Sequence, residues 1–384
     1  MVQQSVRDAG LLGDVADTRR VEPLVREHAD GSVENQTPLL LRSCRTLDQG
    51  RRKVLVGSGR MQRPPESSLA GMLVVDLTRY LPGAFASAEL LRLGARVVRV
   101  EQPGGDPMRE TAPGWHDALN EGKESVELNL PAEAPFLRAL LGRADVVLET
   151  FRPGVLARLG VRHRDLPATA VVCSITGFGV GGRHEQRAGH DLNYQGWAGV
   201  LHDTAPAWPP VQIADLAAGG LGAVTEILAA LLVRERTGAG ATLTVSMTHG
   251  THRFASYRLA GDPRPRLLTG ALACYRTYAT QDGRHLTVGA LEPKFFSRLC
   301  ELLGRPELAA AQYDAEQERL AAELAAVFAS ATLEDWLHVL DREDVCVGPV
   351  ATLAEAAADL GTAAPGRAPE LGAHTESWRR ELGL

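Results

Sequence analysis

The fold is decided by the stretch Gly71–Glu101, which reads GMLVVDLTRYLPGAFASAELLRLGARVVRVE. Residues 72–77 form a short apolar run of strand length, and residues 95–101 form a second one. Between them, Pro82 and Gly83 open a segment with the composition of a helix. A strand, a helix and a second strand in this order predict a βαβ unit, whose two strands run parallel.

Two more apolar runs extend this unit. Residues 145–149 (DVVLE) and 170–175 (AVVCSI) are candidate strands, and the helical segment Pro131–Leu141 separates them from the first pair. The pattern predicts an α/β fold in which a Rossmann-like domain contains a doubly wound parallel sheet. In such a sheet the ligand lies at the carboxyl ends of the strands.

A second pattern begins near Tyr275. The segments YRTYAT and LTVGAL read as a hairpin around Asp282-Gly283, and three helical segments follow at 293–303, 314–330 and 333–341. Thr332 and Asp335 form a candidate capping box for the last of these. This part is predicted to be a smaller α+β domain.

These patterns divide the 384 residues into five parts. Residues 1–68 are rich in Arg, Gln, Asp and Ser and are predicted to be a poorly ordered extension. We expect a large domain over 69–245, a linker over 246–277 and a small domain over 278–350. The final segment, 351–384, is expected to return to the large domain.

Composition excludes several classes of partner. Lys+Arg 41 against Asp+Glu 47 gives a net charge of −6, and no basic tract indicates a nucleic-acid partner. The five cysteines are widely spaced without a CxxC pair, which indicates reduced thiols, a cytoplasmic protein and no metal site. No apolar signal segment opens the chain. The apolar stretch Ile213–Val233 contains Asp215 and Glu226, which favours a buried helix over a membrane span.

Nucleotide-cofactor motifs are missing from the expected places. The first strand-to-helix turn, residues 77–83, lacks the GxGxxG of nicotinamide and flavin sites. Gly177, Gly179 and Gly182 match that spacing but lead into a polar run, so we interpret them as a loop. With no Walker loop, HExxH or GxSxG either, the sequence predicts no separate cofactor.

Eight short segments instead follow one another in a fixed order along the chain. They are RYLPG (79–83), VRVEQPGGDP (98–107), NEGKES (120–125), FRPG (151–154), TGFG (176–179), GHD (189–191), ADLA (214–217) and EP (292–293). Together they resemble the family III CoA-transferases, and within that family most closely the 2-methylacyl-CoA racemases. The resemblance runs from about Leu69 to the end of the chain.

The resemblance implies an enzyme that acts on an acyl-CoA, with CoA present as part of the substrate. It implies a Rossmann-like domain that holds the CoA nucleotide and a homodimer of two interlocked subunits. The active site then lies between the large domain of one subunit and the small domain of the other. Arg99, Arg109, Lys123 and Arg152 match positions or neighbourhoods that meet the phosphates and pantetheine of CoA, where fixed cations suit an anionic ligand.

One segment departs from the family pattern. Glu121 and Glu124 stand where the family usually has basic residues. This exchange removes positive charge near the expected CoA site, and it suggests weaker CoA binding or a different head group.

The resemblance also implies three catalytic residues. Racemisation at the α-carbon needs two acid–base groups that flank this carbon. His190 and Asp215 match these two bases, and Glu292 matches the carboxylate that orients the imidazole. Without the resemblance, His190 reads as a hydrogen-bonded loop residue, Asp215 as an N-terminal helix charge and Glu292 as a helix start before Pro293.

Other polar and aromatic side chains carry weaker signals. Asp191, His184, His249 and His285 have no partner pattern and are interpreted as structural or surface groups. Five aromatic residues either line an apolar acyl pocket or belong to the core: Tyr80, Phe85, Tyr194, Trp197 and Trp208.

Two alternative functions remain open. A CoA-transferase would use Asp215 as a nucleophile and pass CoA between two acids. Residues 288–293 (VGALEP) lack the glycine run of the formyl and oxalyl transferases, and this, with His190, favours the racemase. The third alternative, an inactive acyl-CoA-binding relative, is suggested by Glu121 and Glu124.

Overall fold

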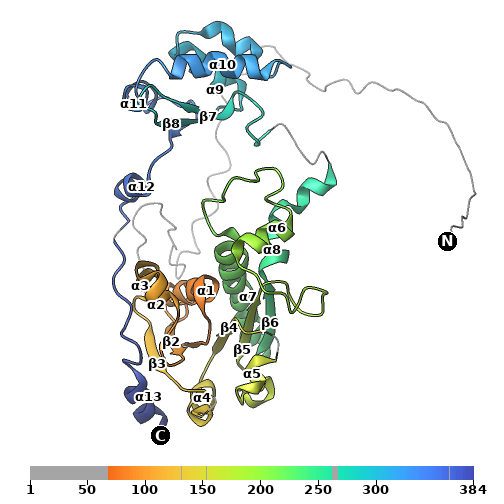
Figure 1. Cartoon of the computed structure of the whole chain (residues 1–384), viewed down its shortest axis with the longest axis vertical. Helices are drawn as coiled ribbons and strands as arrows, with labels where there is room; N and C mark the ends of the chain where they lie inside the picture. Colours follow the sequence, from red (N-terminus) through yellow and green to blue (C-terminus); the bar gives the residue numbers. More distant parts are fainter. Residues whose placement is uncertain (1–67, 131, 153, 262–266, 363) are drawn as a thin grey trace, which may run out of the picture. The chain divides into compact units, whose positions relative to one another are not determined.

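A six-stranded parallel sheet organises the first part of the described chain (Figure 1). The computed structural model describes residues 68–130, 132–152, 154–261, 267–362 and 364–384. The expected extension therefore lies outside the described residues, apart from Ser68. The strands are β1 (Leu73–Asp76), β2 (Arg96–Glu101), β3 (Glu124–Glu127), β4 (Val146–Glu149), β5 (Val171–Thr176) and β6 (Ala241–Ser246).

The strand order is β3-β2-β1-β4-β5-β6, which is the doubly wound Rossmann order. Helices and short helical turns connect these strands. They are α1 (Tyr80–Arg92), α2 (Met108–Thr111), α3 (Pro113–Asn120), α4 (Ala134–Leu141), α5 (Val155–Arg158), η1 (His163–Asp165), α6 (Asp191–Ala198), η2 (Ala214–Leu221) and α7 (Gly222–Thr237). After β6 come α8 (Met247–Ala255) and η3 (Ser256–Ala260).

Neighbouring residues on each strand are buried on opposite faces of the sheet. Val74 belongs to the core under α1 and α7, whereas Val75 belongs to the core under α4. This alternation follows from the two-residue period of a strand. The two apolar layers explain why these strands read as continuous apolar runs in the sequence.

The strands expected at 72–77, 95–101, 145–149 and 170–175 are confirmed as β1, β2, β4 and β5, and all neighbouring pairs are parallel. Sequence reasoning missed β3. Its four residues begin and end with glutamate, and only Ser125 and Val126 between them are buried. A strand this short has too little apolar pattern to stand out.

The η2 segment is a π-helical turn that packs closely on α1. A Cβ atom on Gly219 would lie 2.9 Å from Met247, and one on Gly220 would lie 2.7 Å from Phe85 and 3.2 Å from the Pro82 carbonyl oxygen. Only glycine permits this approach, so Gly219 and Gly220 serve close helix packing. π-Helical turns are rare and occur often at functional sites. Asp215 lies in this turn.

The smaller part of the chain contains an antiparallel sheet of three strands, β7 (Tyr275–Ala279), β8 (His285–Gly289) and β9 (Val347–Pro349). The expected hairpin is confirmed by the β7–β8 register. Its helical elements are α9 (Pro293–Leu302), η4 (Pro306–Ala311), α10 (Gln317–Phe328) and α11 (Leu333–Leu340). The capping box of Thr332 and Asp335 is present at α11. This part has an apolar core of its own, centred on Phe296, Leu324 and Phe328.

The last segment contains α12 (Leu353–Leu360) and α13 (Thr375–Leu382), and α13 lies alongside β3 (Figure 1). Trp378 is fully buried against the sheet, and its indole N–H donates to Glu124 at 2.6 Å. Glu124 also accepts two hydrogen bonds from Arg96. Glu121 accepts the N–H of Gly366 at 2.8 Å. The two unexpected glutamates thus hold the C-terminal segment on the large domain.

One helical stretch, Ala214–Thr237, is long and apolar enough by length and composition to cross a membrane. In the structure it packs against the sheet, and Ala223 and Ile227 are fully buried in the core. One face of the stretch is therefore buried in the core, whereas Leu221, Leu232 and Val233 on it are exposed.

Candidate active site

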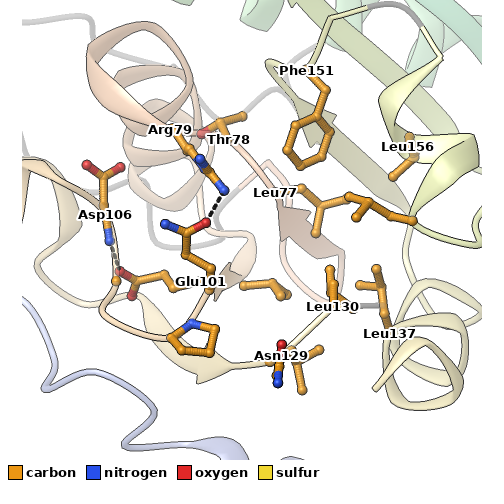
Figure 2. A pocket seen from close by; sticks show the side chains of 16 residues that line it. Leu77, Thr78, Arg79, Glu101, Asp106, Asn129, Leu130, Leu137, Phe151 and Leu156 are labelled. Carbon is orange, nitrogen blue, oxygen red and sulfur yellow. Dashed lines mark hydrogen bonds between the residues drawn. The ribbon is translucent and has the colours of Figure 1, made fainter. Parts of the chain in front are cut away.

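The carboxyl ends of β1, β2 and β4 surround a first hollow, which we name the sheet-edge cavity (Figure 2). Its volume is about 470 Å³. Apolar side chains, among them Leu77, Leu130 and Phe151, form much of its wall. Arg79 enters from the turn after β1 and donates a hydrogen bond to the amide oxygen of Gln102. This cavity lies where a doubly wound sheet binds its ligand.

A second, larger hollow adjoins the first, and we name it the histidine cavity. Its volume is about 760 Å³, and His190 and Asp215 both line it. Three residues line both cavities: Arg79, Phe151 and Leu159. A single elongated ligand could therefore extend from the sheet edge to the pair of His190 and Asp215.

His190 directly precedes α6 as its N-cap residue. Its backbone N–H donates to the Asn193 side chain at 3.0 Å, which fixes the start of the helix. The preceding Gly189 must be a glycine, because a Cβ there would lie 2.8 Å from the ring of Tyr194. The Tyr194 hydroxyl donates to the Gly189 carbonyl. These contacts hold the exposed imidazole at the cavity wall.

Asp191 connects the two candidate bases. One of its carboxylate oxygens accepts the N–H of Ala214 at 2.8 Å and the N–H of Asp215 at 3.0 Å. The other accepts from Gln195. Asp191 is buried and caps the π-helical turn from the segment that carries His190. Of the two readings of Asp191, structural or surface group, the structure supports the structural one, because its carboxylate links the segment of His190 to the turn of Asp215.

Asp215 has an altered acidity. Burial, together with the nearby charge of Asp191, raises the pKa of Asp215 to about 7. Both effects disfavour the ionised carboxylate. A carboxyl group with this pKa can donate or accept a proton near neutral pH, as a general acid or base requires.

Glu292 lies elsewhere in the chain. It is the exposed N-cap residue of α9 in the smaller part. It is not among the residues that line the histidine cavity. The described residues of this chain thus bring together two of the three expected catalytic residues.

The expected CoA-binding cations are placed in three different ways. Arg99 and Lys123 are buried, with exposed fractions of 2% and 3%. Arg99 pairs with Asp106, and Lys123 donates to the Ala84 carbonyl and the Ser87 hydroxyl. Burial lowers the pKa of Lys123 to about 7. In this structure both charged groups have partners inside the protein.

Arg109 forms two hydrogen bonds to Glu101 and a third to the Pro369 carbonyl. Burial alone would raise the pKa of Glu101, but the hydrogen bonds and charge of Arg109 and the charge of Arg99 lower it to about 2. Arg109 therefore ties the C-terminal segment to β2. Arg152 is exposed and lines the histidine cavity, so it is free to meet a ligand there.

Arg79 was not expected as a ligand-binding cation, although it lies in a motif that the sequence displays. Its neighbours in sequence did not reveal that its side chain reaches both cavities. Of the five aromatic candidates, Tyr80 and Tyr194 line the histidine cavity. Phe85 packs against Gly220, Trp197 lines a different hollow, and Trp208 is largely exposed.

Within the described ranges, no group of three or more His, Cys, Asp or Glu side chains gathers closely enough to hold a metal ion. His190 and Asp215 themselves offer proton transfer, and the carboxylate of Asp215 also offers nucleophilic attack.

Comparison with known proteins agrees with this geometry. The sequence model of CoA-transferase family III matches residues 69–377. The chain is 36% identical to the human alpha-methylacyl-CoA racemase over 311 residues, which cover 75% of this chain and 79% of that protein. It is 34% identical to the acetyl-CoA:oxalate CoA-transferase of Acetobacter aceti, over 76% of this chain and 83% of that protein.

Solved structures lead to the same group. A CAIB/BAIF family protein from Brucella suis matches with a TM-score of 0.71 and 29% identity. The match covers 82% of this chain and 99% of that one.

Proposed function

The chain belongs to CoA-transferase family III, and from this premise we propose that it racemises 2-methylacyl-CoA thioesters at the α-carbon. The reaction removes the α-proton to give an enolate and returns a proton to the opposite face. It needs two acid–base groups at one cavity. The observation that carries the proposal is that His190 and Asp215 line one cavity and are joined through Asp191.

The altered acidity of Asp215 supports this function. With a pKa of about 7, Asp215 can hold or release a proton near neutral pH, as a group that acts in both directions of the reaction must. One group takes the proton while the other, in its protonated form, supplies one. Burial of Asp215 excludes part of the water that would compete with this transfer.

The two cavities support an acyl-CoA as the substrate. We propose that the sheet-edge cavity takes the nucleotide end of CoA and the histidine cavity takes the acyl thioester. Arg79 and Arg152, which both line the histidine cavity, replace Arg99 and Lys123 as the proposed cations near the phosphates and pantetheine arm. A guanidinium can form two parallel hydrogen bonds to a phosphate.

We further propose that the active protein is an interlocked homodimer and that Glu292 acts across the subunits. The histidine cavity of one chain contains no contribution from its own Glu292. The exposed position of Glu292 at the start of α9 leaves its carboxylate available to a second subunit. There it would orient the imidazole of His190.

The experiment follows one enantiomer of a 2-methylacyl-CoA by chiral chromatography. Wild-type protein should convert it to the mixture of both enantiomers. His190→Ala should lower the rate by about 10²–10⁴-fold, the usual effect of losing one positioned acid–base group. His285→Ala is the control, because His285 is an exposed residue of β8.

A CoA-transferase is the second candidate, and one observation favours it: a transferase relative is almost as similar to this chain as the racemase is. In that mechanism Asp215 attacks the thioester carbonyl, CoA leaves as the thiolate, and hydroxylamine would convert the resulting acyl–aspartyl anhydride to a hydroxamate. Retained enantiomeric purity together with transfer of CoA to an added acid would replace the first proposal by this one.

A further inference from the structure

Tyr80 has an unusual backbone conformation. Its φ is +63°, and only two other non-glycine residues in the described part of the chain have a positive φ. This left-handed region is unfavourable for a bulky side chain. Such strain persists only where surrounding groups enforce it, and it clusters at functional sites. The observation raises the question of what holds Tyr80 and what its side chain does.

Asp106 holds the backbone of Tyr80. Its carboxylate accepts the Tyr80 N–H at 3.0 Å and the Met108 N–H at 2.8 Å. Asp106 is itself buried, and its carboxylate forms an ion pair with the buried guanidinium of Arg99. Asn120 accepts a further hydrogen bond from Arg99 at 3.1 Å. A buried network behind the cavity thus enforces the strained conformation.

The ring of Tyr80 lies at the histidine cavity. It meets the imidazole of His190 edge to face, with ring centroids 6.2 Å apart and an interplanar angle of 87°. Tyr80 is 45% exposed and lines the cavity. The separation lies within the range of about 4.5–7 Å that aromatic pairs prefer. A group bound beside the imidazole therefore lies within reach of this ring.

We propose that Tyr80 is a specificity-determining residue that limits the size of the group carried on the α-carbon. The inference rests on the proposed function, in which the α-carbon lies between His190 and Asp215. A substituent on this carbon then extends toward the Tyr80 ring. The Tyr80 ring then forms a wall of the cavity. This wall is rigid because the network of Asp106 and Arg99 fixes the backbone that carries the ring.

The test replaces the ring without disturbing the backbone. Tyr80→Gly removes the wall, and glycine adopts a φ of +63° without strain, so the variant should unfold at the same temperature as the wild type or higher. Tyr80→Asn is a second variant, because asparagine also tolerates this region. Tyr80→Phe keeps the wall. Trp115→Ala is the control for loss of an exposed aromatic side chain of the same domain.

Binding of two probes is measured by calorimetry: 2-methylbutanoyl-CoA, and 2-phenylbutanoyl-CoA with a bulkier α-substituent. Wild type, Tyr80→Phe and Trp115→Ala should prefer the smaller probe. In Tyr80→Gly and Tyr80→Asn, the ratio of the two Kd values should shift toward the bulkier probe by about tenfold or more, the usual effect of pocket size on selectivity.

Two outcomes overturn the inference. The first is a Kd ratio in Tyr80→Gly and Tyr80→Asn that stays within about twofold of wild type, because the wall would then not contact the substituent. The second is that neither probe binds wild type, which would also remove the proposed function. Binding with the expected ratios but without racemisation would remove the proposed reaction alone and leave the inference on Tyr80 standing.

Discussion

The carboxyl group of Asp215 makes the protein sensitive to pH. Burial and the neighbouring Asp191 raise its pKa to about 7 in the folded protein, whereas an unfolded chain gives aspartate a pKa near 3.9. Between these two values the folded state binds more protons than the unfolded state. The contribution of Asp215 to stability is therefore most favourable below about pH 4, and this contribution decreases as the pH rises toward 7.

Asp215→Asn should remove this dependence. At pH 8 the variant lacks the buried charge, so its free energy of unfolding should exceed that of wild type by a few kcal/mol, and at pH 4.5 the gain should be much smaller. Denaturant unfolding at the two pH values measures this difference. Asp314→Asn, which alters an exposed carboxylate, is the control. Equal effects of Asp215→Asn at both pH values would contradict the raised pKa.

Asp191 offers a second test at the level of single residues. Asp191→Asn keeps an oxygen that can accept the N–H of Asp215 but removes the charge, so the pH–rate profile of racemisation should shift to lower pH. Asp191→Ala leaves two N–H groups of the π-helical turn without an acceptor and should cost about 1–3 kcal/mol of stability. Identical pH profiles for Asp191→Asn and wild type would show that the charge does not act on Asp215.

Some properties of single residues could be predicted from the sequence and others could not. His190 and Asp215 were expected because they lie in recognisable motifs, and the structure places both at one cavity. The burial of Arg99 and Lys123 was not expected. A charged residue beside a ligand loop looks the same in sequence whether it faces solvent or an internal partner such as Asp106, and only tertiary packing decides which.

At the scale of elements, the π-helical turn η2 positions the site. It places Asp215 at the cavity and packs on α1 through Gly219 and Gly220. The apolar helix after Asp215 was predictable from composition. Its π-helical first part was not, because one extra residue per turn leaves no mark in a run of Ala, Gly and Leu.

Gly220→Ala tests this packing. The new Cβ would meet Phe85 and the Pro82 carbonyl, so the variant should lose about 1–3 kcal/mol of stability, and its racemase activity should fall because Asp215 moves. Gly114→Ala in α3 is the matched control, because a Cβ there meets nothing within 4 Å. It should be neutral or stabilising. The interpretation would fail if both variants had the same thermal stability and activity.

At the scale of the whole molecule, the parallel sheet was predicted from its apolar runs, whereas the short strand β3 was not. Glu121 and Glu124, which the sequence alone presented as a loss of CoA-binding charge, accept hydrogen bonds from the C-terminal segment: Glu121 from Gly366 and Glu124 from Trp378 of α13. Within one chain the three expected catalytic residues do not lie together, since Glu292 lies outside the histidine cavity. A second subunit is therefore central to the proposed function.

Mixed dimers test the role of that subunit. Co-expression of His190→Ala and Glu292→Gln chains should restore about one quarter of wild-type activity, since about half of the dimers are mixed and each has one intact site of two. Mixing the two proteins after folding should restore nothing if the subunits are interlocked. Absence of activity after co-expression would place Glu292 in the same subunit as His190. Full activity of Glu292→Gln on its own would place Glu292 outside catalysis.

The central claim is that His190 and Asp215 exchange the proton of the α-carbon. The most direct measurement follows a 2-methylacyl-CoA by proton NMR in deuterated water. We expect the signal of the α-proton to disappear at a rate that depends on His190 while the thioester stays intact. A fully retained α-proton in the presence of wild-type protein, with CoA passing to an added acid, would contradict it.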